Sequence, residues 1–272
     1  MTLPEIHPRI SVNPSSFPAA TPYAEILATV KRLGLPAVDA PRTRLAPLGW
    51  EEGLRLLEES GLAVTTFIHR TMFALDRPDT WAEGRAEIRE TIAGAARFGA
   101  PVYGTTGPGP AVGLTWEESA ARFVEAVAPA VADAQAQGVL LMVETTQPLF
   151  ADYHFLHTLR DTVDVCEQAG LGVCLDVHGT WNERGLRTTI ERAGPRLGLV
   201  QLSDYAPGMR SMDRGIPGDG VMPLEQILSW VLETGYEGRF DLELWGDSGM
   251  PDGDAILRGA AHVGALLERL GA

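Results

Sequence analysis

Residues 115–145 read TWEESAARFVEAVAPAVADAQAQGVLLMVET and contain, in one stretch, the alternation that decides the fold. Thr115 and Glu118 have the spacing of a capping box, in which each side chain bonds the other residue's backbone at a helix start. The helix that begins there is expected to end at Gly138 and to be kinked or split at Pro129. The apolar run after Gly138 is typical of a strand that is buried on both faces of a parallel sheet.

The same order of helix, glycine and apolar strand recurs along the chain. The stretch GLAVTTFIH (61–69) is a second buried strand of this kind. Alternating strands and helices, at a spacing of about thirty residues, predict a parallel sheet. The expected strands are 8–13, 36–41, 62–69, 101–106, 139–145, 172–178, 197–204 and 238–245, and the expected helices are 22–33, 50–60, 81–98, 116–137, 155–169, 184–194, 223–235 and 254–270.

Eight such units in 272 residues favour closure into a single (β/α)8 barrel. An open doubly wound sheet is the alternative architecture. No linker, low-complexity tract or run of charge divides the chain, so one domain over 1–272 is expected.

Composition excludes several classes of function. A net charge of −14 argues against binding to nucleic acid or to an anionic membrane surface. Cys166 and Cys174 do not form a disulfide framework. Neither a signal peptide nor an apolar membrane span is recognisable, which predicts a cytoplasmic protein. The single lysine, Lys31, falls in an expected outer helix, which excludes a Schiff-base aldolase.

Four consecutive strands, from the fifth to the eighth, carry an oxygen-bearing side chain inside an apolar run near the strand's end. Active sites of such barrels lie at the C-terminal ends of the strands. A buried, isolated carboxylate is costly, so four such groups at one level predict a shared divalent cation. The ordinary alternative is that each group pairs with an arginine or a helix N-terminus. The candidate ligands are Glu144, Asp176, Gln201 and Glu243.

Three carboxylates and one amide form a hard, all-oxygen ligand set. Such a set suits Mn2+ or Mg2+ better than a zinc site rich in histidine or cysteine. Mn2+ is therefore the metal expected, with Mg2+, Co2+ and Zn2+ as alternatives.

Three motifs make the resemblance to a known family specific. They are VQLSDY (200–205), RGIPGDG (214–220) and GYEGRFDLEL (235–244). Together with the strand-end residues they resemble the xylose isomerase-like barrel superfamily, also called sugar phosphate isomerases/epimerases. The resemblance covers the whole chain and is strongest from Leu140 to Gly246. It implies that the four strand-end residues hold a metal.

The resemblance also indicates which members of the superfamily are most similar to this chain. Many relatives have a histidine at the position of Gln201. A glutamine there resembles the hydroxypyruvate isomerase-like members of the superfamily, and the chain also resembles its tagatose 3-epimerase-like members. Endonuclease IV shares the fold, but its histidine-rich zinc site and basic face are missing from this sequence.

Further residues are expected to bind substrate. The resemblance implies that Arg214 binds an oxygen atom or an anionic group of the substrate. Many relatives have a histidine where this chain has Gly179, but His178 shares a face with the strand-six aspartate and should point into the site. His69, at the end of strand three, is expected to face the pocket, and Trp181 to form a wall of it.

The predicted function is that of a divalent-metal-dependent isomerase or epimerase. It would act on a keto-sugar or related hydroxy-carbonyl compound through a metal-stabilised enediolate, with Glu144 and Glu243 moving the proton. A metal-dependent lyase or dehydratase acting on a keto-sugar or keto-cyclitol is the nearest alternative. A non-catalytic sugar-binding barrel or partner subunit is the alternative of another class. By analogy with relatives, a homo-oligomer is also expected.

Overall fold

The computed structural model describes residues 5–208, 213–245 and 251–272. Residues 1–4, which begin the stretch expected to carry no signal peptide, lie outside it. The strands are β1 (Ile10–Val12), β2 (Ala37–Pro41), β3 (Ala63–Thr71), β4 (Val102–Thr105), β5 (Leu141–Glu144), β6 (Gly172–Asp176), β7 (Leu197–Leu202) and β8 (Phe240–Leu242). The helices are α1 (Tyr23–Arg32), α2 (Arg42–Leu45), α3 (Trp50–Ser60), α4 (Trp81–Phe98), α5 (Trp116–Ala136), α6 (Leu159–Ala169), α7 (Val177–Thr180), α8 (Leu186–Ala193), α9 (Leu224–Glu233) and α10 (Gly253–Arg269).

The strand order from β1 to β8 is that of a closed parallel barrel. The predicted (β/α)8 fold is therefore confirmed. By contacts within the chain, the molecule divides into two compact units. One comprises residues 66–198, and the other comprises residues 1–65 together with 199–272.

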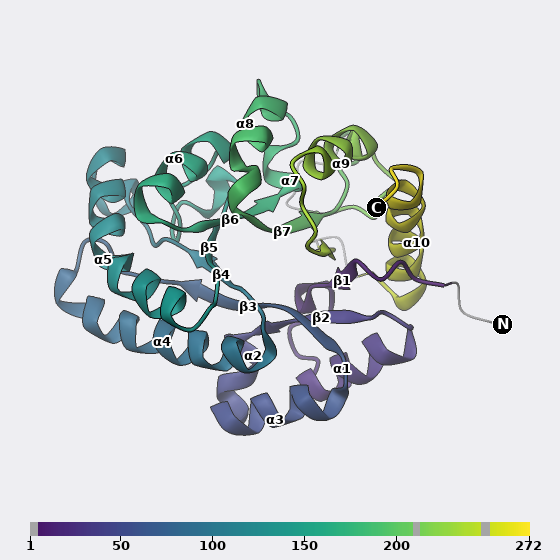
Figure 1. Ribbon diagram of the computed structural model, residues 1–272, viewed down its shortest axis with the longest axis horizontal. Coiled ribbons are helices and arrows are strands. Elements are labelled where there is room, and N and C mark those ends of the chain that lie inside the picture. The colour runs from purple at the N-terminus through teal and green to yellow at the C-terminus, as the bar shows by residue number, and fades with distance from the viewer. Residues whose placement is uncertain (1–4, 209–212, 246–250) are drawn as a thin grey trace. The chain divides into compact units, whose positions relative to one another are not determined.

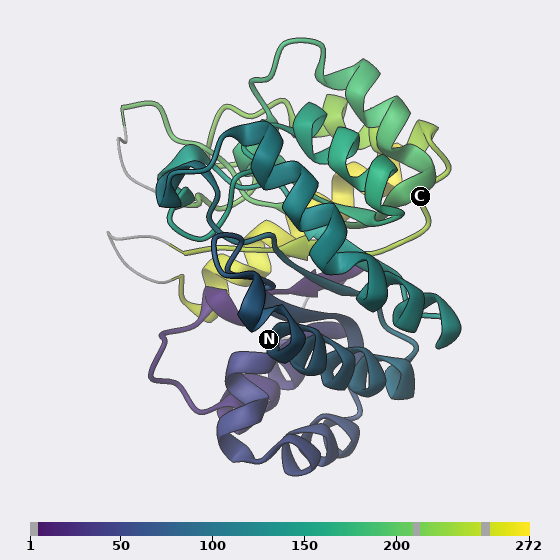
Figure 2. The ribbon, with the colours of Figure 1, turned by 90° about the vertical axis from the view of Figure 1, so that its left-hand side faces the viewer.

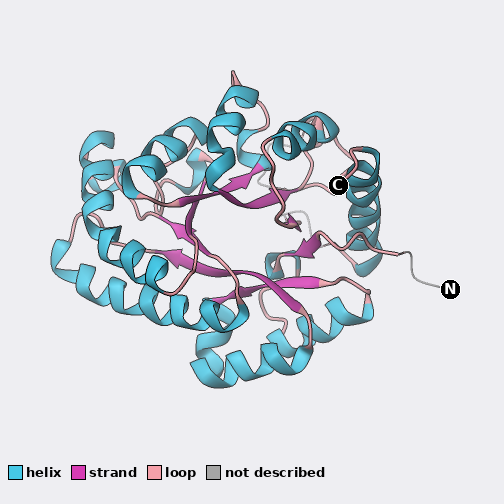
Figure 3. Cartoon of the chain, viewed as in Figure 1, coloured by secondary structure: helices cyan, strands magenta, loops and turns pink. Residues whose placement is uncertain are grey.

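The unit of residues 66–198 is built on consecutive strands. β3, β4, β5 and β6 pair in that order and are all parallel. Figure 1 shows α4 and α5 side by side along this sheet, and these two helices pack against each other. Figure 3 shows the same helices as a layer outside the strands.

The second unit joins the two ends of the chain. β1 lies between β2 and β8, and β7 pairs with the other edge of β8, again all parallel. Figure 2 shows α1 and α3 together in this unit, where they pack against each other. The first strands of the chain are thereby in register with the last.

The helix at the centre of the quoted stretch forms as expected at its start. Thr115 Oγ1 accepts from the Glu118 backbone N at 3.1 Å, and Glu118 Oε2 accepts from the Thr115 backbone N at 2.8 Å, which confirms the capping box. Of the expected kink or split at Pro129, the split is wrong, because α5 continues across this residue; the kink stays a prediction. Pro129 and Glu125 are both exposed, so the carbonyl that loses its helical partner lies on the solvent side of the helix.

Both cysteines are free, and both are buried. Within the described ranges, no helix combines the length and the apolar character needed to cross a bilayer.

Candidate functional site

In the unit of residues 66–198, two of the predicted ligands end neighbouring strands. Glu144 is the last residue of β5 and is half-buried, whereas Asp176 is the last residue of β6 and is fully buried. Glu144 is in register with Cys174, two residues before Asp176. The parallel pairing of β5 and β6 thus puts both carboxylate residues at the same edge of the sheet.

Asp176 also shapes the turn that follows its strand. Its Oδ1 accepts a hydrogen bond from the backbone N of His178 at 2.9 Å, and its carbonyl accepts one from Thr180 Oγ1 at 2.9 Å. Asp176 is therefore the N-cap of the short helix α7. One of its carboxylate oxygens is committed to the backbone.

His178 is 5% exposed and contacts a residue that the sequence did not single out. Gln147 Nε2 lies 2.8 Å from His178 Nδ1 and 3.4 Å from the His178 carbonyl oxygen. Gln147 lies in the loop after β5, three residues beyond Glu144. Because this contact joins a loop to the short helix α7, no periodicity in the sequence could have indicated it.

Gly179 occupies the position at which many relatives have a histidine. A Cβ placed there would lie 3.6 Å from the Thr145 carbonyl oxygen, 3.7 Å from Asp176 Oδ2 and 3.8 Å from Gln147 Cγ. These are ordinary van der Waals distances, so the backbone at Gly179 leaves room for a side chain beside Asp176.

In the other unit, Glu243 follows β8 and contacts two neighbours. Its Oε2 lies 3.2 Å from Arg214 Nη1, and its Oε1 accepts from Ser15 Oγ at 3.4 Å. The Arg214 guanidinium also lies over the ring of Trp245, 5.4 Å from its centroid. The predicted substrate-binding arginine therefore holds the predicted base in place. Gln201, fully buried on β7, is in register with Asp241 on β8.

Two buried carboxyl groups in this unit were missed by the sequence analysis. Asn13 Nδ2 donates to Asp39 Oδ2 at 3.2 Å and to Asp241 Oδ2 at 3.3 Å, and Ser11 Oγ donates to Asp241 Oδ1 at 2.8 Å. Both aspartates are fully buried. A carboxylate inside an apolar run, the criterion applied to the other strands, would have found them.

Burial is the main cause of the raised pKa values of Asp39 and Asp241. It raises the pKa of Asp39 well above its usual range, and the charges of Asp241 and Glu243 raise it further. Burial also raises the pKa of Asp241 to about 7, opposed by its hydrogen bonds to Asp39, Ser11 and Asn13. Two carboxyl groups in this setting share a proton more readily than they carry two charges.

A further aspartate organises the loop after β7. Asp204 Oδ1 accepts from the backbone N of Tyr205 at 2.8 Å and of Met222 at 3.0 Å. Its Oδ2 accepts from the backbone N of Gly218 at 2.9 Å and of Gly220 at 3.1 Å. The motif RGIPGDG thus folds back onto the carboxylate that ends VQLSD.

His154 and His157 lie in the loop after β5. Thr106 donates to His154 Nδ1 through its backbone N at 3.0 Å. Burial lowers the pKa of His154 to about 3, helped by the neighbouring His157, so the ring is neutral. Burial also lowers the pKa of His157, which lies 3.2 Å from the Thr146 carbonyl oxygen. Both are structural histidines of this loop.

The two remaining predicted residues are placed differently. His69 Nδ1 lies 3.0 Å from Thr91 Oγ1 of α4, and this contact with a helix does not support the expected orientation toward the pocket. The pairing of β3 with β4 shifts register between Ile68 and Thr71, and such a bulge re-aims neighbouring side chains. Trp181 is half-buried at the end of α7, where its backbone N bonds the Val177 carbonyl.

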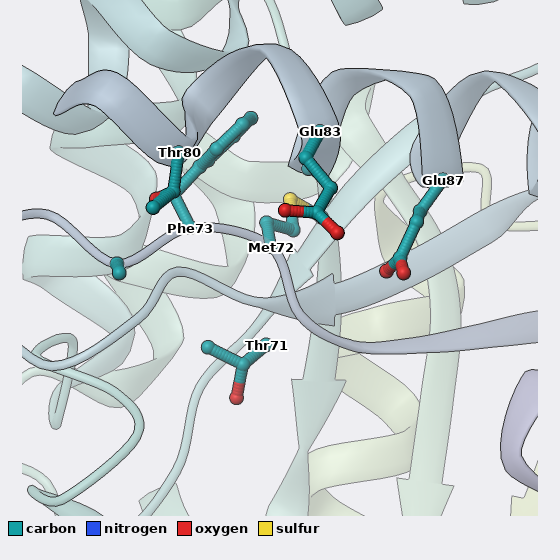
Figure 4. A pocket seen from close by; sticks show the side chains of 8 residues that line it. Thr71, Met72, Phe73, Thr80, Glu83 and Glu87 are labelled. Carbon is teal, nitrogen blue, oxygen red and sulfur yellow. The ribbon is translucent and has the colours of Figure 1, made fainter. Parts of the chain in front are cut away.

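One open pocket of about 190 Å3 lies between α4 and the segment after β3. In Figure 4, Glu83 and Glu87 project from the helix toward this segment, and Thr71 lies across from them. Both glutamates are exposed. Solvated carboxylates one helical turn apart are common on protein surfaces and do not by themselves indicate a site.

Solved structures share this architecture. A crystal structure of a protein from Sinorhizobium meliloti 1021 is 24% identical, with 93% of this chain and 96% of that chain covered and a TM-score of 0.83. D-psicose 3-epimerase with D-tagatose, from Clostridium cellulolyticum H10, is 18% identical over 97% of this chain and 98% of that chain, with a TM-score of 0.74. The IolI protein with a bound zinc atom is 14% identical over 96% and 99%, with a TM-score of 0.80.

No functionally curated protein matches the sequence. The family model described as xylose isomerase-like TIM barrel matches residues 27–266. The chain therefore belongs to the xylose isomerase-like TIM barrel family.

Proposed function

We propose that the chain is a divalent-metal-dependent isomerase or epimerase that acts on a keto-sugar or a related hydroxy-carbonyl compound. The observation that carries the proposal is the placement of oxygen-bearing residues at the ends of adjacent strands. Glu144 and Asp176 end β5 and β6, Gln201 lies on β7, and Glu243 follows β8.

The donor set fits a hard divalent cation. It contains only carboxylate and amide oxygens, and Asp176 and Gln201 are fully buried. Glu144, Asp176 and Glu243 are candidates for holding a metal ion. The zinc atom of the IolI structure is compatible with a metal in this fold. Mn2+ as the metal, a homo-oligomeric state and a cytoplasmic location stay predictions.

A bound divalent cation would polarise the substrate carbonyl and acidify the neighbouring carbon-bound proton. The residues of the chain supply the rest of the chemistry. Glu144 removes the proton and Glu243 returns it, or the reverse, since epimerisation takes a proton from one face of the carbon and returns one to the other face. Arg214 keeps Glu243 oriented through the 3.2 Å ion pair, and its guanidinium group also binds a substrate oxygen.

A lyase is the second candidate, and Gly179 is the observation that favours it. The position beside Asp176 has no side chain with which to hold a substrate hydroxyl. A hydroxyl on the carbon next to the enediolate can then take up the proton from the protonated carboxyl group and leave as water. The electron pair of the enediolate forms the new carbon–carbon double bond, which gives elimination instead of proton return to carbon.

The test begins with elemental analysis of the purified protein after incubation with Mn2+. The wild type should hold about one ion per chain, whereas Asp176→Ala should lose it and the surface control Asp133→Ala should keep it. No metal in the wild type would refute the metal-dependent function and would favour a non-catalytic sugar-binding barrel.

The second step uses keto-sugars in deuterated water. Deuterium incorporated next to the carbonyl, detected by NMR, reports proton abstraction. A saturated product then indicates an isomerase or epimerase, and new ultraviolet absorbance from an unsaturated product indicates a lyase. No deuterium exchange with any keto-sugar by the metal-loaded protein would refute both.

A further inference from the structure

We propose that Gln147 is a positioning residue that fixes the tautomer of His178, so that this ring offers an N–H donor from Nε2 to a substrate oxygen. Only the assignment of the acceptor as a substrate oxygen rests on the proposed function. The tautomer itself follows from the contacts of the two side chains.

The geometry identifies which atom of Gln147 makes the contact. The same side-chain atom lies 2.8 Å from His178 Nδ1 and 3.4 Å from the His178 carbonyl oxygen. A carbonyl oxygen only accepts hydrogen bonds, so the atom shared by both contacts is the amide nitrogen, which only donates. Nδ1 of His178 is therefore the acceptor. In a neutral imidazole the proton is then on Nε2.

Both partners are held by neighbouring structure. The backbone N of His178 is bound to Asp176 Oδ1 at 2.9 Å, directly after β6. Gln147 lies three residues after Glu144 and begins the short helical turn Pro148–Phe150. The Gln147 Cγ also lies within 3.8 Å of the Cβ position of Gly179. The pair is thus built from the loop that follows β5 and from the short helix α7 that follows β6.

This tautomer decides what His178 can do. A nitrogen that carries a proton has no lone pair with which to bind a metal, so Nε2 of His178 is excluded as a metal ligand. It can instead donate to an oxygen atom that carries or develops negative charge, such as a carbonyl or alkoxide oxygen. Gln147 and His178 together would then provide the polar contact that Gly179 lacks.

The test reads the tautomer directly. Chains labelled with 15N-histidine are observed by long-range 1H–15N correlation at pH 8.5, with Zn2+ as a diamagnetic metal, and His178→Asn identifies the His178 signals. In the wild type, His178 Nδ1 should resonate as an unprotonated nitrogen and Nε2 as a protonated one. A protonated Nδ1 in the wild type would overturn the proposal.

Two variants test the role of Gln147. In Gln147→Glu the carboxylate can only accept, so Nδ1 should become protonated; in Gln147→Met, which has no donor, the two nitrogens should shift toward averaged positions. Gln226→Glu, an exposed change on α9, should leave the His178 signals unchanged. Wild-type signals in both Gln147 variants would refute the assignment.

Kinetics separate this proposal from the proposed function. With an active keto-sugar, Gln147→Glu should lose at least about tenfold in kcat/KM, the equivalent of one hydrogen bond, while keeping its metal. Unchanged kcat/KM would overturn the role in substrate binding. If the wild type is inactive with every keto-sugar, the proposed function fails, and the 15N spectra still decide the tautomer.

Discussion

Arg214 Nη1 lies 3.2 Å from Glu243 Oε2, and the two side chains are only 4% and 12% exposed. Glu243→Gln keeps the shape of the site but removes the charge that faces the guanidinium. Turnover should fall by about 10²- to 10⁴-fold, the usual contribution of a general acid or base. Steady-state kinetics check this, with circular dichroism to show that the fold is kept.

The control for this change is Glu237→Gln, an exposed glutamate three residues before β8. It should leave kcat and the unfolding temperature unchanged. Glu144→Gln should lose turnover as Glu243→Gln does, and wild-type rates in either variant would contradict the assignment of these residues as the bases.

Gly179→His should fold, because the Cβ position meets its neighbours only at 3.6 Å or more. An added imidazole beside Asp176 should lower the KM for a keto-sugar by about five- to tenfold if it gains one hydrogen bond. Gly104→Ala is the contrasting variant, since a Cβ there would lie 2.0 Å from the His69 carbonyl oxygen and should prevent folding. Thermal denaturation and KM measurements distinguish the two outcomes.

The difference in unfolding free energy between Asp39→Asn and the wild type should change in favour of the variant when the pH is raised from 5 to 8. Burial raises the pKa of Asp39 above its unfolded value of about 4, so the native state holds a proton that the unfolded state has lost. Its contribution to stability is therefore present at low pH and is lost as the pH rises through the folded pKa. Urea unfolding at the two pH values should show a smaller decrease for Asp39→Asn than for the wild type, with exposed Asp79→Asn behaving like the wild type.

His154 affects the pH dependence of stability in the opposite direction to Asp39, since its contribution is lost as the pH falls. Burial lowers its pKa to about 3, so the neutral ring contributes stability above its unfolded pKa of about 6.5 that is lost as the pH falls toward 3. The loss is on the order of 5 kcal/mol at its limit. His154→Asn keeps an acceptor for Thr106 and should be less stable at pH 7 but should lose less stability on acidification. An acid limb as steep as that of the wild type would contradict this account.

Asp204→Asn should loosen the loop after β7. The four backbone N–H groups around Asp204 all need an acceptor, and an amide NH2 replaces one of the two oxygens that they use. Hydrogen bonds to a charged group contribute about 1.5–3 kcal/mol each. Limited proteolysis should cut the variant between 205 and 222 faster than the wild type. An equal cutting rate would show that the carboxylate is not what holds the loop.

The barrel was predictable because its signal is periodic. Glycine-terminated helices and apolar strands repeat along the chain, and the expected strand 139–145 contains the observed β5. Asp39 and Asp241 were also within reach of the same reasoning, since each is a carboxylate inside the apolar run of a strand, β2 and β8.

Contacts that depend on local irregularity were not predictable in this way. The contact of Gln147 with His178 joins a loop to the short helix α7, and the path of that loop follows no period. The contact of His69 with Thr91 lies beside a register shift in the pairing of β3 with β4, and no pattern of side chains in the sequence predicts that shift. The continuous helix across Pro129 reflects an exposed position on the helix, which propensity alone does not describe.

The donors that surround Asp204 are all backbone groups, so the loop after β7 is specified by one carboxylate and by the absence of side chains at Gly218 and Gly220. A Cβ at Gly220 would lie 2.3 Å from Asp204 Oδ1. Val221 is exposed, and the exposed Asp219 side chain pairs with Arg258 of α10. The path of this loop therefore depends on one buried carboxylate and two glycines, so the loop should keep its path when an exposed residue such as Val221 is replaced.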